Sequence, residues 1–335
     1  MKDVAKHAGV SVSTVSYVLN DSGPVAAPRR ARVLEAIRAL EYTPNESARS
    51  LKRRSASTIG LVVPDLSNQF FALVAEGVER EASARGVLVV LCVPGATDVP
   101  EAQHAALLRG QRLDGVVYLS GTGTAPREIL ELADSGHIVL VDEQIAGFDL
   151  PSVVADGRRG AREIAASVLQ MGHRQLAVIG GPAALWTAEQ RLAGYREAFA
   201  GAGIDPDEVP VYTGDYRMAS GERLAEEALT CAGPRPTALL CANDLMAIGA
   251  LEYCKREGLR VPEDVSIAGF DDLPIAALLT PRLTTVRQPA AEMGAMAARL
   301  LFELIDGRSS DGDEYSEPLP AELLLRESVG PAPRG

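Results

Sequence analysis

From Thr58 onward, short apolar runs alternate with longer amphipathic segments, and this alternation limits the possible folds more than any other feature of the chain. The runs are almost wholly apolar, which is typical of strands buried on both faces of a sheet. They are Ile59–Val63, Val87–Cys92, Gly115–Leu119, Ile138–Val141, Leu176–Ile179, Ala238–Cys241 and Val265–Ala268. The helical periodicity between most of them predicts β-α-β units, and therefore an α/β fold built on parallel sheets.

The number of predicted strands favours two sheets rather than one. About ten strands would overfill a single doubly wound sheet, whereas two lobes of roughly 120 residues each have the usual size of a domain. No apolar run approaches the roughly twenty residues that cross a bilayer. Asp3, Lys6 and His7 interrupt any signal-peptide pattern at the start of the chain. We therefore expect a cytoplasmic protein with a two-lobed body and no membrane partner.

The first 40 residues follow another pattern, which predicts three short helices. Gly9 ends the first helix, Ser11 caps the second, and Pro28 lies in the first turn of the third. The apolar stripe of the third helix is Val33, Leu34, Ile37 and Leu40. A further helical segment, Glu46–Arg53, is too short to be stable alone in water, so it needs a partner in order to form.

Charge is distributed unequally between these two parts of the chain. Residues 1–58 hold ten Lys and Arg against five Asp and Glu, a formal charge of +5; the whole chain carries −12, which leaves −17 for the remainder. A basic head on an acidic body is expected when only the head approaches phosphate groups. A solvated helical surface would give the same pattern, so charge alone leaves both interpretations open.

Residues 2–20 have the mechanics of a helix-turn-helix, because two short helices meet at a glycine turn and small polar residues begin the second. Together with later motifs, this segment resembles the lactose/galactose repressor (LacI/GalR) family over nearly the whole chain. The later motifs are Tyr42–Asn45, Ala48–Lys52 and Ile59–Pro64. The resemblance implies a homodimeric, DNA-binding transcription regulator, by family default a repressor, and no enzyme.

The resemblance also implies how the chain is divided. A helix-turn-helix domain of three helices would occupy 1–44, a hinge helix and linker 45–57, and an effector-binding and dimerisation domain 58–330. The last would have the two lobes of a periplasmic sugar-binding protein. Its first lobe would comprise about 58–155 and 285–316, and its second about 156–282 and 317–330.

By the resemblance, ten residues contact a pseudo-palindromic operator in double-stranded DNA. They are Ser11, Val12, Ser13, Thr14, Ser16, Tyr17, Asn20, Arg49, Leu51 and Lys52. Val12, Ser13 and Tyr17 would read bases in the major groove. Two Leu51 side chains would wedge into a central base step of the minor groove. Many members carry Arg where Tyr17 stands, which leaves the operator sequence open. Packing roles for Val12, Tyr17 and Leu51 are the alternative.

The effector would bind in the crevice between the lobes, at the strand ends. The residues that match the family's cleft positions are Phe70, Phe71, Asp142, Trp186, Thr187, Arg191, Tyr216, Asn243 and Asp271. Arg191 offers a planar donor fork to ligand oxygens, and Trp186, the only Trp, offers a flat apolar platform. One of the two Phe is expected in the core, and Asp244 is expected to cap a helix instead of contacting ligand.

The family contains readers of sugars and of purines. Leu185 stands where a purine reader would hold Arg, so we expect a sugar-like effector. Its binding would shift the lobes between two states and change the spacing of two DNA-binding heads. A periplasmic-type solute-binding protein without a DNA role is the alternative. No GxSxG turn or P-loop supports an enzyme, and the Cys and His spacing predicts no metal or other cofactor.

Overall fold

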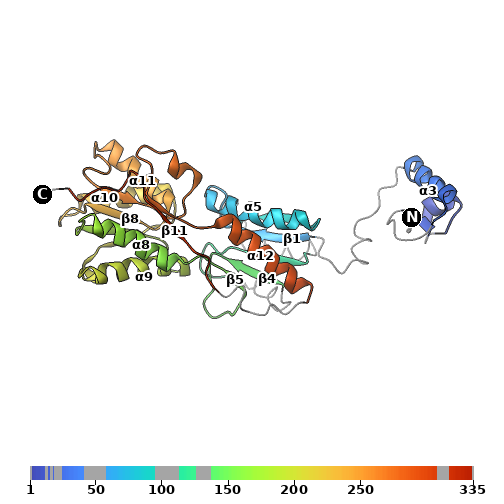
Figure 1. Ribbon diagram of the computed structural model, residues 1–335, viewed down its shortest axis with the longest axis horizontal. Coiled ribbons are helices and arrows are strands. Elements are labelled where there is room, and N and C mark those ends of the chain that lie inside the picture. Colours follow the sequence, from blue (N-terminus) through green and yellow to red (C-terminus); the bar gives the residue numbers. More distant parts are fainter. Residues whose placement is uncertain are drawn as a thin grey trace. The chain divides into compact units, whose positions relative to one another are not determined.

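The computed structural model describes residues 2–11, 14–15, 18, 25–40, 58–94, 113–125, 137–307 and 317–333. The chain divides into two compact units, a head, Met1–Ser55, and a body, Ala56–Gly335 (Figure 1). The body has the predicted α/β architecture with parallel sheets. Among the described helices, none combines the length and the apolar character that crossing a membrane requires.

The head has a small apolar core that α1 (Lys2–Ala8) and α3 (Ala27–Ala39) share. The core residues are Val4, Ala5, Ala8, Val15, Val18, Val33 and Ala36. Ser11 Oγ accepts a hydrogen bond from the backbone N–H of Thr14 at 3.2 Å, as an N-cap does. The predicted stripe on the third helix is wrong at Leu34 and Leu40, which are 41% and 42% exposed, because Val33 and Ala36 form the buried face.

The first lobe is a five-stranded parallel sheet in the order β2-β1-β3-β4-β5. Its strands are β1 (Thr58–Val62), β2 (Leu88–Cys92), β3 (Gly115–Tyr118), β4 (Ile138–Val141) and β5 (Ser152–Val153). Two helices, α5 (Gln69–Ala84) and α12 (Ala290–Ile305), lie side by side against it (Figure 1). A Cβ on Gly77 would lie 1.9 Å from the carbonyl oxygen of Ala291, so only glycine permits this helix contact.

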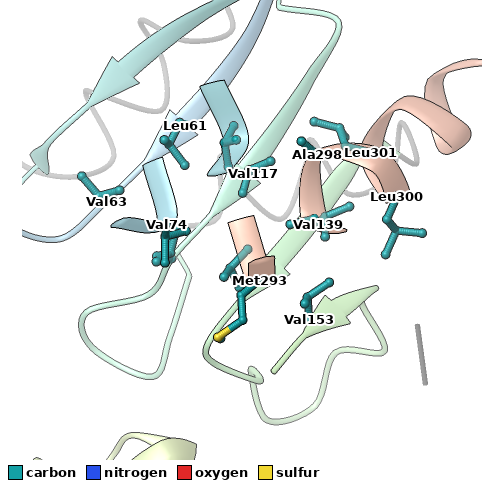
Figure 2. Close-up of a cluster of buried hydrophobic side chains, with 14 of the residues drawn as sticks. Leu61, Val63, Val74, Val117, Val139, Val153, Met293, Ala298, Leu300 and Leu301 are labelled. Atoms are coloured by element: carbon teal, nitrogen blue, oxygen red, sulfur yellow. The ribbon is translucent and has the colours of Figure 1, made fainter. Parts of the chain in front are cut away.

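Side chains from β1, β3, β4, α5 and α12 fill the core of the first lobe (Figure 2). The labelled members are Leu61, Val63, Val74, Val117, Val139, Val153, Met293, Ala298, Leu300 and Leu301. Residues from both ends of the body therefore meet in one core. Removing a buried Leu side chain here would lower the free energy of unfolding by about 2–5 kcal/mol, so this core stabilises the lobe that carries the residues at its strand ends.

The second lobe is a four-stranded parallel sheet in the order β7-β6-β8-β9. Its strands are β6 (Leu176–Gly180), β7 (Val211–Thr213), β8 (Ala238–Cys241) and β9 (Ser266–Ala268). Its helices are α8 (Gly157–Gln170), α9 (Trp186–Gly201), α10 (Met218–Thr230) and α11 (Asp244–Arg256). One apolar core includes residues of α8 and α9 and another those of α10 and α11, so each helix pair covers its own face of the sheet.

Three segments of the described chain pass between the lobes. One joins β5 to α8, one joins β10 (Thr285–Arg287) to α12, and one leads into β11 (Glu322–Leu324). β10 pairs antiparallel with β11, and Val286 packs in the core of the second lobe. Residues 285–287, which the sequence assigns to the first lobe, thus pack in the second, where Arg287 bridges Asp271 in the loop after β9 and the Val286 carbonyl oxygen accepts from the Asp271 N–H.

Candidate functional site

A cavity of about 390 Å³ lies between the two lobes of the body. Its walls come from the segments that follow the carboxyl ends of β1, β3 and β4 in the first lobe and of β6, β7, β8 and β9 in the second. Parallel strands place their carboxyl ends at one edge of a sheet, so two sheets facing each other at those edges enclose a crevice lined by loops and helix starts. This is the position predicted from the sequence.

Eight of the nine residues predicted for the cleft line this cavity: Phe70, Phe71, Asp142, Thr187, Arg191, Tyr216, Asn243 and Asp271. Phe70 is also a buried member of the first-lobe core, and Phe71 packs against that core at a ring distance of 5.7 Å from Phe70. Trp186 does not line this cavity but a second one. Successive helical residues point about 100° apart, so α9 directs Thr187 and Arg191 into the cleft and Trp186 away from it.

Arg191 lies at the centre of the second-lobe wall, with only 4% of its surface exposed. Its Nη1 donates to the carbonyl oxygen of Ala242 at 2.5 Å, and its Nη2 lies 3.5 Å from Asp271 Oδ1. The guanidinium stacks at 4.2 Å from the ring centre of Phe270 and 5.7 Å from that of Tyr216. Although burial opposes the charged form, Tyr216, Asp271 and Asp142 raise the pKa of Arg191 above its ordinary value.

Three carboxyl groups face the same space. Burial raises the pKa of Asp271 to about 7 against the opposing effect of Arg191, and Gln288 Nε2 donates to Asp271 Oδ1 at 2.8 Å. Burial, with a contribution from Asp142, raises the pKa of Glu143 to about 7. The pKa of Asp142 is raised by burial too. One buried cation therefore faces several carboxyl groups that hold protons more readily than in water.

Asp142, Tyr216 and Asp271 occupy the left-handed region of backbone conformation, with φ of 67°, 65° and 113°. Each follows a strand end, and each directs its side chain into the cavity wall. Such conformations cost about 1–3 kcal/mol apiece in residues other than glycine and persist where the surrounding structure imposes them, often at ligand sites. Asp272, beside Asp271, is the other described non-glycine residue with a positive φ, so these conformations concentrate in the loops at the cavity edge.

Asn243 and Asp244 have structural roles beside the cavity. Asn243 Oδ1 accepts from the N–H of Met246 at 2.9 Å as the N-cap of α11, and its Nδ2 donates to the carbonyl oxygen of Tyr216 at 3.0 Å. Asp244, outside the cavity wall, accepts from the N–H of Leu273 at 2.7 Å and from Thr285 Oγ1 at 2.6 Å. Asp244 therefore ties loops together, and the prediction that it caps a helix is wrong, because the N-cap of α11 is Asn243.

Two contacts join the lobes across the cavity, and the sequence does not predict them. Glu143 of the first lobe accepts hydrogen bonds from the Thr187 N–H at 3.3 Å and from the Thr187 hydroxyl. Arg217 Nη2 of the second lobe lies 3.7 Å from Asp65 Oδ2 of the first. Among the described residues, Asp142 Oδ1, Arg191 Nε and Tyr216 Oη are buried in this region without a hydrogen-bond partner. A polar molecule between the lobes would supply the missing partners.

The residues predicted to contact DNA lie mostly outside the described part of the chain. Ser11 and Thr14 are described, and their hydroxyl oxygens lie 2.8 Å apart at the start of the second predicted helix. The other eight are Val12, Ser13, Ser16, Tyr17, Asn20, Arg49, Leu51 and Lys52. The DNA contacts of all ten residues stay predictions.

Two family models match the chain. Residues 1–45 match the model described as bacterial regulatory proteins, lacI family, and residues 165–329 match a periplasmic binding protein-like domain. The transcriptional regulator RegA of Clostridium saccharobutylicum is 35% identical over 98% of both chains. The ribose operon repressor of Halalkalibacterium halodurans is 34% identical over 98% of this chain and 96% of its own.

Among solved structures, the Lac repressor dimer bound to operator and the anti-inducer ONPF is similar over 98% of both chains, with a TM-score of 0.84 and 27% identity. The similarity therefore covers the head and the body together. A body that resembles binding proteins and a head that matches bacterial regulators occur in one chain, in the order expected from the sequence.

Proposed function

The chain belongs to the LacI family of bacterial regulatory proteins, and we propose that it is a transcriptional repressor whose affinity for operator DNA is set by a small molecule bound between its two lobes. The observation that carries this proposal is the cleft, where Arg191 Nε and Asp142 Oδ1, one from each lobe, are buried without partners. A ligand that bonds to both would favour one arrangement of the lobes over another.

The chemistry of the cleft favours a neutral, polyhydroxylated ligand such as a sugar. Hydroxyl groups both donate and accept, so they match a wall that mixes the Arg191 guanidinium with the carboxyl groups of Asp142 and Asp271. The side chain of Leu185 also lines the cavity and offers no donor to a purine ring. The ribose operon repressor is named for a sugar-related operon, which agrees with this ligand class.

We propose that the protein acts as a homodimer on a pseudo-palindromic operator, as the Lac repressor dimer does on its own operator. Apolar side chains suited to a subunit interface are exposed on both lobes: Leu88, Val90 and Leu91 on edge strand β2, and Ile275 and Leu278 beside the second sheet. Leu88 is 66% and Leu278 81% exposed, and such side chains are commonly buried between subunits.

On the DNA side, Val12, Ser13 and Tyr17 would read bases, and Ser11, Thr14, Ser16 and Asn20 would position the helix on the backbone. Paired hinge segments would place Leu51 in the minor groove, with Arg49 and Lys52 on flanking phosphates. The reading as a solute-binding protein without a DNA role accounts only for the body, whereas the lacI model matches residues 1–45.

The test uses the full chain and an operator obtained by selection from random DNA. Operator affinity is measured by fluorescence anisotropy with and without D-ribose, D-glucose, cellobiose, adenosine and hypoxanthine. We expect a sugar to change the affinity about fivefold or more and the bound species to be a dimer. Monomeric binding, with the same affinity whatever compound is added, would contradict the proposal.

The hinge is tested separately with Leu51→Ala. We expect the free energy of binding to the specific operator to weaken by about 2 kcal/mol, while binding to random DNA stays nearly the same. The reason is that the Leu51 wedge would unstack a base step and bend the operator, and the bent DNA makes additional contacts with the protein. Lys52→Ala is the matched control, since loss of a phosphate contact weakens both DNAs alike. Equal losses on both DNAs with Leu51→Ala would refute the wedge.

A further inference from the structure

A second cavity of about 420 Å³ lies in the body, on the other side of the α9 start from the main cleft. Its first-lobe wall is Gly123, Leu140 and the loop Gln144–Leu150 with Ser152, and its second-lobe wall is Ala183–Trp186 with Glu189. Leu185 lines both cavities and is buried, so its side chain lies in the partition between them. None of the other lining residues is shared with the main cleft.

The partition is a direct contact between the lobes. Glu143, which lines the main cleft, accepts hydrogen bonds from Thr187, and their chain neighbours Gln144 and Trp186 line the second cavity. Close by, a Cβ on Gly123 would lie 2.0 Å from the carbonyl oxygen of Ala184, so the two lobes touch backbone to backbone. Both cavities therefore depend on the same seam between the lobes.

The side chains of the second cavity suit a neutral saccharide. Trp186 and Phe148 supply flat apolar faces, and Phe148 is 48% exposed although it is large and aromatic. Gln144 and Ser152 supply an amide and a hydroxyl, and Asp149 and Glu189 supply carboxylates that accept from sugar hydroxyls. Among the described residues, the lining includes Asp149 and Glu189 and no Lys, Arg or His, so this part of the wall disfavours a phosphorylated or otherwise anionic sugar.

We propose that this second cavity is an accessory binding site for a neutral saccharide, separate from the effector cleft. Its walls belong to both lobes, so an occupant stabilises the seam that the main cleft also uses. Any effect of one occupant on the affinity of the other cavity is then equal in both directions, because binding free energies are reciprocal. The proposal assigns to Trp186 a ligand platform in a different cavity from the one expected from the sequence.

Trp186 is the only tryptophan, so its fluorescence reports directly on this cavity. The full chain is titrated with D-ribose, D-glucose and cellobiose, and with glucose 6-phosphate as the anionic counterpart. Three proteins are compared: the wild type, Phe148→Ala in the second cavity, and Asp142→Asn in the main cleft. We expect a saturable emission change with a neutral sugar. Its midpoint should rise about tenfold in Phe148→Ala and change far less in Asp142→Asn.

Several outcomes would overturn the proposal. One is that no neutral sugar changes the Trp186 emission. Another is that glucose 6-phosphate changes it as much as a neutral sugar does. The third is a midpoint that moves with Asp142→Asn and not with Phe148→Ala. Glu189→Gln provides a second variant of the cavity should Phe148→Ala fail to fold. The operator measurements under Proposed function use DNA affinity as their readout, so failure of the effector cleft and failure of the accessory site give different results.

Discussion

The two lobes have the same architecture but prepare the cleft in different ways. In the second lobe, the cleft residues make most of their bonds within their own lobe: Arg191 to Ala242 and Asp271, and Asn243 to Tyr216, although Arg191 Nε has no hydrogen-bond partner among the described residues. In the first lobe, Asp142 Oδ1 has no hydrogen-bond partner among the described residues, and Glu143 bonds across to Thr187. The cleft wall of the second lobe is thus largely preorganised, whereas Asp142 and Glu143 of the first lobe complete their bonding only against the other lobe or a ligand.

The largest effect on the difference between the lobes is expected when Arg191, whose bonds organise the cleft wall of the second lobe, is removed. Arg191→Ala removes the ion-pair partner of Asp271, which keeps only its hydrogen bond from Gln288, and the donor to the buried carbonyl oxygen of Ala242. We expect the free energy of unfolding to fall by about 3 kcal/mol, together with loss of effector response. Denaturant unfolding of the purified chain, with and without the active sugar, measures both effects.

Arg256→Ala is the matched control, because Arg256 makes its ion pairs with Glu222 and Glu257 on the exposed surface of the same lobe. Arg256→Ala should lower the free energy of unfolding by less than about 1 kcal/mol and leave the effector response intact. If Arg191→Ala is as mild as this control, the second lobe is not organised around Arg191.

Glu143 of the first lobe should make the free energy of unfolding depend on pH. Glu143 has an ordinary pKa of 4.5 that rises to about 7 in the folded protein. Between these values the folded chain holds a proton that the unfolded chain has released, so the free energy of unfolding falls as the pH rises from about 4.5 to 7. Glu143→Gln removes this dependence; we expect equal stability at pH 5 and a gain on the order of 2 kcal/mol at pH 8.

Asp271→Asn is the counterpart in the second lobe, since burial also raises the pKa of Asp271 to about 7. It should flatten the same pH dependence, but it also removes the ion-pair partner of Arg191 and therefore weakens the preorganised network. Urea midpoints measured from pH 5 to pH 8 test both variants. Parallel curves for Glu143→Gln and the wild type would show that Glu143 is ionised throughout.

Removing the carboxyl group of Asp142 in the first lobe should change effector affinity more than it changes the free energy of unfolding. Asp142→Asn keeps the size of the side chain and removes a buried carboxyl whose pKa burial raises. We expect the free energy of unfolding to change by less than about 1 kcal/mol, and effector affinity to fall about tenfold through the loss of one charge-assisted hydrogen bond. Calorimetric titration with the active sugar provides the measurement. An unchanged affinity would mean that the first lobe does not contact the ligand through Asp142.

The sequence predicts much of this site because its residues follow strands that are recognisable as apolar runs. β4 ends just before Asp142 and β9 shortly before Asp271, so the positions of these residues follow from the topology of parallel sheets. The seven predicted runs all correspond to strands, whereas β5, β7, β10 and β11, of two or three residues each, lie outside them. β9 also has three residues, but it lies in the longer apolar run Val265–Ala268. A strand this short is therefore predicted only where an apolar run extends beyond it.

What the sequence does not predict is pairing across the seam. Glu143 lies beside the predicted Asp142, yet its partner Thr187 is 44 residues away in another lobe, and no local pattern encodes that contact. Trp186 is predicted to line the effector cleft, but its position on the first turn of α9 directs its side chain into the second cavity instead. Docking of the lobes therefore determines which strand-end residues share a cavity.

The smallest expected effect comes from the pair at the mouth of the cleft. Arg217 and Asp65 lie 3.7 Å apart across the lobes, and Arg217 is largely exposed. Arg217→Ala should therefore change the free energy of unfolding by less than about 0.5 kcal/mol. If the pair breaks when the lobes separate, the same variant should release the effector about twofold faster at low salt, and the difference should vanish near 1 M salt, where charges are screened within about 3 Å. Arg223→Ala is the control, because Arg223 pairs with Glu227 within α10 and spans no seam. Stopped-flow release rates that are equal for both variants would show that the mouth pair takes no part in holding the lobes together.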